Sequence, residues 1–380
     1  MRNLSFIICV TFLFLSFFLA TCKKKSSKKE EEKSQTFSSF VANLNQVQIE
    51  SEQEPFTSEN IIIPFRLDLD NYGNVLAVSP SDWNLQLLDK NGVSLGIQGG
   101  NGMGPGEFQV VNSIYVDEKN NIFILDMRGN KIESYGVRND SLIYRMGFSL
   151  PSYYPFLIYD FAKVGDQYFG IFKDVFSQHS DGKNDQSFIL YSLNDKLEME
   201  EELYVLPTGV VADRKGNGIM QNEFLSYETY RIFRNSKLFI ANSKEFSVTE
   251  VDLVTRSVKN YDLGYFPKRK KKEEEVDYIL DEYEGLTTIF PNVENNLREP
   301  GNFPLFSVFD VTSEYAYFRI YNFSEESNSQ IIRINLSSNE KELITVSKNF
   351  YFYRATDEAV YGIYEGLDRR YPMRIQLDNL

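Results

Sequence analysis

Cysteine and histidine are nearly missing from this 380-residue sequence, which contains two cysteines and one histidine. Cys9 lies inside an N-terminal apolar run and Cys22 ends it, so a chain cut at that point keeps no pair of thiols for a disulfide. A Ser-His-Asp triad, a zinc site or a histidine general base would have to use His179, in a polar stretch expected to be a solvated loop. The scarcity disfavours all these chemistries.

Basic side chains are also too few to balance the acidic ones. The sequence has 40 Lys and Arg against 54 Asp and Glu, for a formal net charge of -14. Residues 1–33 are locally basic, so residues 34–380 are more acidic than the whole chain. An acidic body without a basic groove repels phosphate backbones. Nucleic acid is therefore not an expected partner.

The N-terminus has the three parts of a secretory signal. Arg2 precedes an almost continuous apolar run, Leu4–Thr21, which ends at Cys22 and is followed by KKKSSKKEEEK. The last four residues, LATC (Leu19–Cys22), resemble a bacterial lipobox, although Thr21 stands where Gly or Ala is usual. That resemblance implies cleavage before Cys22 and a lipid on it. The alternative is an uncleaved membrane anchor, because the apolar run could nearly span a bilayer.

This N-terminus predicts three parts of the chain. Residues 1–21 are a lipoprotein signal peptide, the polar residues 22–45 are a solvated tether, and residues 46–380 form the body. The lipid on Cys22 would make a membrane the first partner. We expect a lipid-anchored protein of the bacterial cell envelope, in the outer membrane, with its body in the periplasm or at the cell surface.

Aromatic side chains are abundant, at 15% of the sequence, which favours strands. A polar turn followed by an apolar strand occurs six times. The strands begin, by this pattern, at Val75, Ile122, Tyr168, Leu238, Ala316 and Val360. Three of the five gaps are 47, 46 and 44 residues, close to the roughly 40–50 residues of a four-stranded propeller blade. The two longer gaps, of 70 and 78 residues, contain insertions.

Six copies predict an all-β fold, a six-bladed β-propeller. A pair of β-sandwiches is the alternative, and the single period argues against it. The chain ends near the third strand of blade six, which would leave an open sheet edge. We expect an N-terminal strand near Gln46–Glu50 to complete that blade and close the ring.

The insertion at residues 267–302 predicts a short amphipathic helix between blades four and five. Val276, Ile279, Leu280 and Tyr283 follow helical spacing after a run of lysines and glutamates. A packed, solvated insertion is the simpler interpretation. The alternative is a lid that contacts a partner or a membrane.

A glycine-rich stretch, GGNGMGPGEF at residues 99–108, raises the question of a phosphate-binding loop. Such a loop leads from a strand into a helix, whereas strand patterns lie on both sides here. Pro105 stands where the third glycine would be needed, and no Gly-Lys-Ser/Thr follows. We therefore expect no nucleotide, and interpret the stretch as an inter-blade crossover in which glycines permit positive φ angles and Phe108 anchors the corner.

The same stretch carries a resemblance to a known family. Its GxGPGEF signature is made of Gly102, Gly104, Pro105, Gly106, Glu107 and Phe108. A later turn and two strand starts match at Asp117, Asn121, Ile122, Asn130, Lys131 and Ile132. The sequence is similar here to the bacterial six-bladed propeller lipoproteins, related to NHL-repeat and TolB-like propellers. The resemblance implies the fold and an envelope location, and no activity.

Two further motifs are given structural rather than catalytic or metal-binding interpretations, the second of them as a hairpin turn. GVSLG, at residues 92–96, matches the nucleophile elbow of hydrolases, but a turn precedes it and no helix follows. DLDNYGN, at residues 68–74, resembles part of a calcium loop, yet Tyr72 occupies a ligand position and Ser79 replaces the bidentate acid.

No catalytic set is found, so the first functional hypothesis is a non-catalytic binding or scaffolding module without a cofactor. Its partners would be an envelope protein or a carbohydrate. The alternative is a calcium-dependent hydrolase or lactonase of the gluconolactonase type, with Ca²⁺ held by Asp, Asn and Glu near the channel. Three or more oxygen ligands converging there would distinguish the two.

Overall fold

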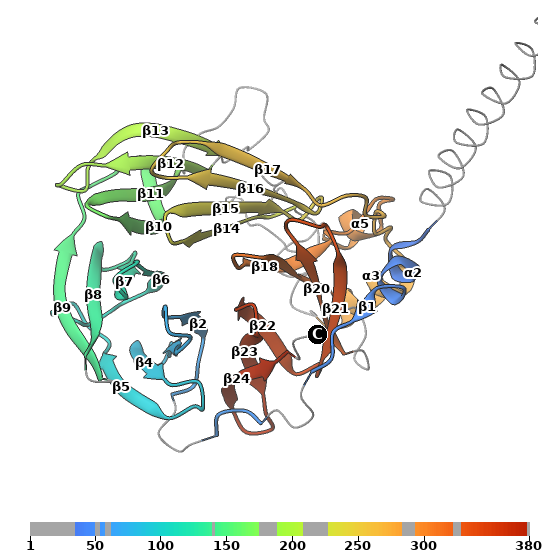
Figure 1. The fold of residues 1–380 in the computed structure, drawn as a ribbon, viewed down its shortest axis with the longest axis horizontal. Helices are drawn as coiled ribbons and strands as arrows, with labels where there is room; N and C mark the ends of the chain where they lie inside the picture. The colour runs from blue at the N-terminus through green and yellow to red at the C-terminus, as the bar shows by residue number, and fades with distance from the viewer. Residues whose placement is uncertain are drawn as a thin grey trace, which may run out of the picture.

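The computed structural model describes residues 35–49, 54–57, 62–138, 141–174, 188–207, 227–282, 293–321 and 328–377. Six β-sheets stand around a central axis like the blades of a propeller, with the first strand of each nearest the centre (Figure 1). The prediction of a six-bladed β-propeller is confirmed.

Five blades begin with four consecutive antiparallel strands, and the sixth has three. Blade one contains β2 (Arg66–Leu69), β3 (Val75–Val78), β4 (Asn84–Leu88) and β5 (Ser94–Gly99). Blade two contains β6 (Val111–Val116), β7 (Asn121–Asp126), β8 (Lys131–Arg138) and β9 (Ser141–Ser149). Blade three contains β10 (Phe156–Val164), β11 (Gln167–Asp174), β12 (Phe188–Leu193) and β13 (Met199–Leu206).

The remaining blades follow in chain order. Blade four contains β14 (Thr229–Arg234), β15 (Lys237–Asn242), β16 (Ser247–Asp252) and β17 (Val258–Asp262). Blade five contains β18 (Phe306–Val311), β19 (Tyr315–Ile320), β20 (Ser329–Asn335) and β21 (Lys341–Val346). Blade six contains β22 (Phe350–Ala355), β23 (Ala359–Glu365) and β24 (Arg370–Gln376). The six repeat positions found in the sequence all lie in second strands, at the first or second residue.

The polar turns that punctuate the repeat are held by their own side chains. The Asp70 carboxylate accepts the backbone N–H of Asn74 at 2.8 Å, and the Asn74 side-chain amide donates to it at 2.9 Å. Asp117 and Asn121 repeat both bonds, each at 2.7 Å. Gly73, at φ +78°, supplies the left-handed residue of the first turn. The interpretation of residues 68–74 as a hairpin turn is confirmed.

The blades pack face to face through aromatic side chains. Between blades four and five, the Phe306 and Phe318 rings lie 4.8 Å apart, and Phe246 lies 4.9 Å from Phe318. Phe306 and Phe318 are fully buried. Large rings fill the wedge between two twisted sheets with few residues, which agrees with the aromatic richness of the sequence.

The N-terminal strand corrects one prediction. The strand β1 (Asn45–Gln46) pairs in parallel with β21, so it extends blade five and not blade six. Blade six is reached by an isolated bridge between Ile49 and Leu377, and by the Phe56 N–H, which donates to the Pro372 carbonyl at 2.9 Å. The N-terminal segment therefore crosses the outer rim from blade five to blade six.

The preceding helix gives the physical reason. The helix α2 (Phe37–Ala42) buries Phe37 and Val41 in the cluster between blades four and five, which brings the chain to β21 first. This helix lies within residues 22–45, the stretch predicted to be a tether, so its last part packs on the body. Residues 1–34, with the predicted signal peptide and Cys22, lie outside the described residues, as does His179.

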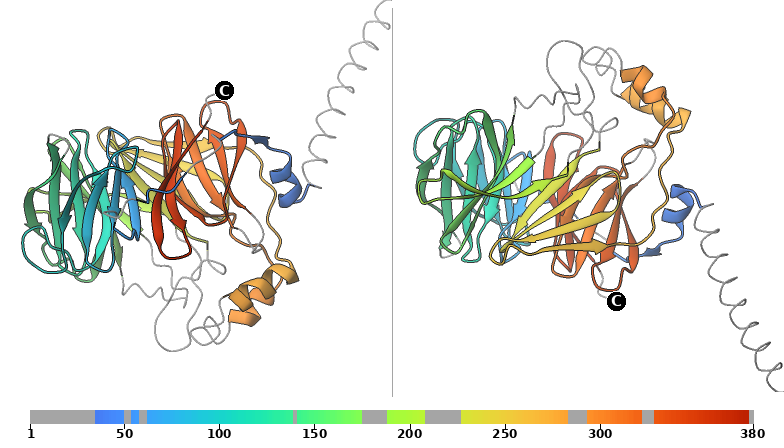
Figure 2. Two further views of the ribbon diagram at one scale, coloured as in Figure 1. Left: turned by 90° about the horizontal axis from the view of Figure 1, so that it is seen from below. Right: turned by 90° about the horizontal axis from the view of Figure 1, so that it is seen from above.

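The predicted helical insertion between blades four and five is present. Its helices, α3 (Glu273–Glu282) and α5 (Val293–Arg298), lie beside each other and project from one face of the ring (Figure 2). Val276 and Ile279 are buried against Val293 and Leu297, as the helical spacing predicts. Tyr283 lies outside the described residues. Among the residues that are described, no helix is long and apolar enough to cross a membrane.

Candidate functional site

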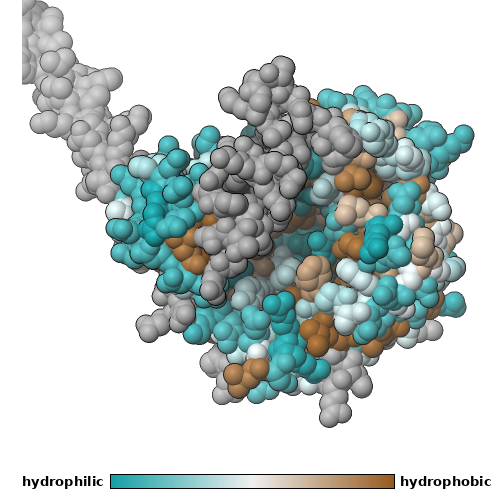
Figure 3. All heavy atoms as spheres, turned by 180° about the vertical axis from the view of Figure 1, so that it is seen from behind, coloured by the Kyte–Doolittle hydropathy of each residue, from teal (hydrophilic) through white to brown (hydrophobic). Residues whose placement is uncertain are grey.

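A cavity of about 710 Å³ occupies the central channel. Its walls come from the first strands of blades one, two, three, four and six, with Phe188 from β12. Seen from behind, hydrophilic and hydrophobic side chains are interspersed on the described surface (Figure 3). Volumes of this size suit a small-molecule ligand.

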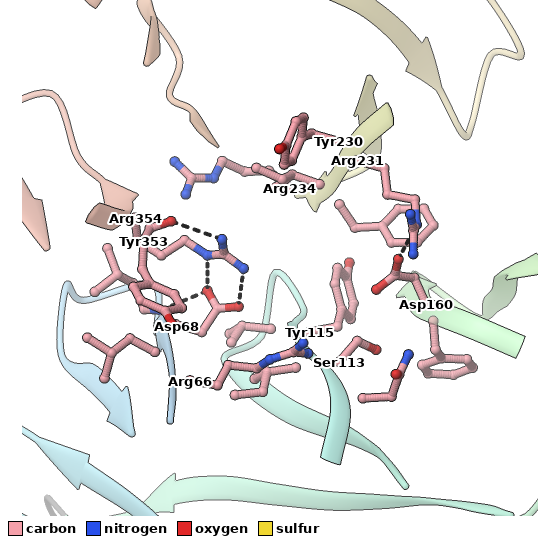
Figure 4. A pocket seen from close by; sticks show the side chains of 18 of the residues that line it. Arg66, Asp68, Ser113, Tyr115, Asp160, Tyr230, Arg231, Arg234, Tyr353 and Arg354 are labelled. Atoms are coloured by element: carbon pink, nitrogen blue, oxygen red, sulfur yellow. Dashed lines mark hydrogen bonds and ion pairs between the residues drawn. The ribbon is translucent and has the colours of Figure 1, made fainter. Parts of the chain in front are cut away.

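Arginine–aspartate pairs join neighbouring blades inside the channel. The Arg354 guanidinium on β22 donates two hydrogen bonds, of 3.0 and 2.9 Å, to the Asp68 carboxylate on β2 (Figure 4). Such bidentate pairs are the strongest of the ordinary charged hydrogen bonds. This pair ties the last blade to the first.

A second pair joins blades three and four. The Arg231 Nε on β14 donates to Asp160 on β10 at 2.6 Å. The Arg231 guanidinium also lies 4.0 Å from the centre of the Phe188 ring, a cation–π distance. Both charges are thereby held on one wall of the cavity.

A third pair lies deeper, where Arg234 approaches Asp310 of β18 at 3.3 Å. Asp310 is fully buried and also accepts the Ala355 N–H at 2.6 Å. Burial raises the pKa of Asp310, against the opposing effect of Arg234 and Arg354. This carboxylate therefore receives bonds from blades four and six at once.

Arg66 on β2 differs from these three arginines. It lines the same cavity and points into it (Figure 4), yet its guanidinium forms no hydrogen bond or ion pair with any residue that the structure describes. Burial lowers its pKa; Asp160 opposes that effect and Arg354 adds to it. A partly buried guanidinium without a partner has lost water contacts that nothing in this part of the protein replaces.

Other polar side chains of the channel form hydrogen bonds within the protein. Burial raises the pKa of Glu228, although its hydrogen bond with Tyr230 and the charge of Arg231 oppose this. The Tyr353 hydroxyl donates to the Phe65 carbonyl at 3.2 Å. Ser113 also lines the cavity.

Two acidic side chains of the cavity are already engaged. Asp68 and Asp160 are each paired with an arginine, so their oxygens are occupied by partners within the protein. Among the described residues, no group of three or more His, Cys, Asp or Glu side chains could hold a metal ion.

The glycine-rich stretch lies away from the channel, between β5 and β6. Its Glu107 carboxylate accepts the Gly104 N–H at 2.8 Å, and the Lys131 ammonium donates to the Gly104 carbonyl at 2.8 Å. The Tyr135 hydroxyl donates to the Gly106 carbonyl at 2.8 Å. Phe108 is fully buried between blades one and two. The loop is thus bound to the body through its own polar groups.

The channel residues were missed by the sequence analysis. It examined turns and second strands, whereas the charges lie on first strands, at Arg66, Asp68, Asp160, Arg231, Arg234, Asp310 and Arg354. A usable signal was present, because a charged residue inside the first strand of a repeat must face either a neighbouring blade or the axis. Which charges pair could not be found that way.

Comparisons with known proteins agree on the fold. A family model described as 6-bladed beta-propeller matches residues 81–207. A putative exported protein from Bacteroides fragilis superposes with a TM-score of 0.50 at 11% identity, covering 89% of this chain and 95% of its own. A comparison with curated proteins finds no match.

Two further solved structures are similar at a lower level. A member of the duf4221 family from Bacteroides vulgatus has a TM-score of 0.47 at 10% identity, with 89% of this chain and 100% of that one covered. A catalytically inactive virginiamycin B lyase from Staphylococcus aureus has a TM-score of 0.44 at 8% identity, with 87% and 100% covered. At such identities the likeness concerns the fold alone.

Proposed function

We propose that this protein is a lipid-anchored, non-catalytic binding module of the bacterial cell envelope, and that its ligand enters the central channel. The observation that carries the proposal is the channel itself: about 710 Å³ lined by side chains from five blades, with its aspartates already paired. Polar groups fixed by such pairs can orient a ligand without reacting with it. The partner would be a carbohydrate or a peptide from an envelope protein.

The envelope location rests on separate support. The N-terminal run that ends at Cys22 has the features of a lipoprotein signal. The structurally similar Bacteroides fragilis protein is described as a putative exported protein. Lipid on Cys22 would hold the propeller at the outer membrane, with the body in the periplasm or at the cell surface.

The channel is tested by blocking it. The detergent-solubilised full-length protein is melted with and without the carbohydrate fraction, and separately the peptide fraction, of the bacterium's envelope. A bound ligand should raise the melting temperature. Ser113→Trp should abolish that rise by filling the cavity, whereas Ser141→Trp, on the exposed outer strand β9, should keep it.

Two results would contradict channel binding: neither fraction shifts the parent, or the shift persists in Ser113→Trp. Should Ser113→Trp not fold, Ser113→Leu replaces it, since a smaller side chain intrudes less on the packing.

Lipid anchoring is tested by labelling cells with a fatty-acid analogue. The parent should incorporate label and fractionate with the outer membrane, whereas Cys22→Ala should do neither. Label on Cys22→Ala would disprove lipidation at Cys22, whereas an unlabelled parent in the membrane fraction would favour the uncleaved anchor.

A further inference from the structure

We propose that the ligand of the channel carries a single carboxylate and that Arg66 binds it. This inference rests on the proposed function, because it assumes that a ligand enters the cavity, and it adds the chemical class of that ligand. Arg66 is the arginine of the channel whose guanidinium has no hydrogen-bond or ion-pair partner among the described residues.

Among the arginines that line the cavity, Arg66 is the one with no ion pair to a described residue. Arg231, Arg234 and Arg354 are each bound to an aspartate. Asp70 also lines the cavity, but its carboxylate accepts the N–H groups of its own turn. Glu228 is the remaining acid, and burial raises its pKa, which weakens its tendency to carry charge.

The geometry of a guanidinium favours a carboxylate. Its planar fork offers two parallel N–H donors that match the two oxygens of a carboxylate. Arg354 already forms this arrangement with Asp68 in the same cavity, at 3.0 and 2.9 Å. A ligand carboxylate on Arg66 would repeat that geometry with an external partner.

The acidic side chains near Arg66 also limit the charge of the ligand. Asp68 and Asp160 both face the cavity that Arg66 enters (Figure 4). The negative charges of both act to raise the pKa of Arg66. A dianionic phosphate would place a second negative charge near these carboxylates without a second free cation to balance it. A monoanion is therefore favoured over a phosphate.

The rest of the lining suits the body of an acidic sugar. Tyr159, Tyr230 and Tyr353 line the cavity and present flat rings with polar ends. Ser113 adds a hydroxyl to the lining of the cavity. A uronic acid combines ring hydroxyls with one carboxylate, so it could use both kinds of group.

The test is calorimetric titration of the detergent-solubilised full-length protein with three probes: glucuronate, glucose and glucose 6-phosphate. They share a ring and differ in the group at one end, which is a carboxylate, an alcohol or a phosphate. We expect glucuronate to bind at least about tenfold more tightly than either of the others, as one charged hydrogen-bond pair requires.

Two variants separate recognition from folding. Arg66→Gln should weaken glucuronate binding at least about tenfold while leaving the melting temperature of the free protein unchanged or higher. Arg66→Lys should lose part of the affinity, because it keeps the charge and loses the fork. Arg298→Gln, in the helix α5 and outside the cavity lining, should bind like the parent.

Three results would overturn the assignment: equal affinity for glucose, tighter binding of the phosphate, or unchanged glucuronate binding by Arg66→Gln. If none of the probes binds, the acidic-sugar assignment fails. The binding module would then still be judged by the envelope fractions and the blocked channel, so the two failures are distinguishable.

Discussion

The glycine-rich loop at residues 99–108 and the central channel both contain groups that could bind an anion. In the loop, the N–H and carbonyl of Gly104 are taken by Glu107 and Lys131, and Phe108 is packed beneath. In the channel, three arginines are paired, and Arg66 has no ion pair with any residue that the structure describes. The difference teaches that unsatisfied polar groups, rather than glycine content, mark the place where a ligand can add bonds.

The largest expected loss of stability comes from removing the ring that anchors the glycine-rich loop. Phe108→Ala should lower the free energy of unfolding by about 3–5 kcal/mol, because a fully buried ring is replaced by a cavity. Urea denaturation of the full-length protein measures it. Phe65→Ala is the matched control, since Phe65 is 45% exposed and should lose far less. A loss below about 1 kcal/mol for Phe108→Ala would show that the corner is not anchored there.

The next effect concerns the paired side of the channel. Arg354→Gln should cost about 2–3 kcal/mol, because it leaves Asp68 partly buried without its bidentate partner. Arg370→Gln, in an exposed pair with Glu365 on the same blade, should cost less than about 1 kcal/mol. Similar losses in both variants would argue that the channel pair is no stronger than a surface pair.

A third change tests backbone geometry in the loop. Gly106 has φ +76°, and an added Cβ would lie 3.3 Å from the Tyr144 ring. Gly106→Val should therefore cost about 1–3 kcal/mol, and Gly106→Asn should cost less, because asparagine tolerates positive φ. Thermal melts compare the two variants.

The loop is also expected to bind no nucleotide. Calorimetric titration of the parent with ATP and NAD should give no binding heat, and micromolar binding lost in Gly106→Val would make the loop a ligand site.

The smallest effect sharpens the comparison within the channel itself. Arg66→Gln should change the free energy of unfolding by less than about 0.5 kcal/mol, or raise it, because no bond inside the protein is lost. Comparing its loss of stability with that of Arg354→Gln distinguishes an arginine that stabilises the ring from one that is available to a ligand. A loss as large as that of Arg354→Gln would reveal a structural role for Arg66.

Much of the fold could be predicted because contacts between residues close in sequence determine it. The turns at Asp70 and Asp117 bind their own asparagines four residues later, so each signals a hairpin without help from the rest of the chain. The insertion helix was equally local, since Val276 and Ile279 bury one face. The turns and the strands after them repeat six times, three of the five gaps being 44–47 residues, and this repeat identified the six blades.

The remaining features depend on contacts between distant residues. Arg354 and Asp68 are 286 positions apart, and no local pattern says that they meet. The partner of β1 was predicted wrongly for the same reason: an open edge on blade six was visible in the sequence, whereas the anchoring of α2 between blades four and five was not. Arg66 could be seen as a charge in a strand, but its lack of a partner is a property of the assembled ring.

The rim crossing by the N-terminal segment has a consequence for the order of folding. The Thr345 hydroxyl donates to Gln46 at 3.1 Å across 299 positions, and Phe56 donates to Pro372. A chain made from its N-terminus cannot form these bonds until nearly all of it exists, and closing so long a loop is entropically costly and slow. This N-terminal segment is therefore the last to dock, although it is synthesised early. Until it docks, the outer strands of blades five and six have unpaired edges.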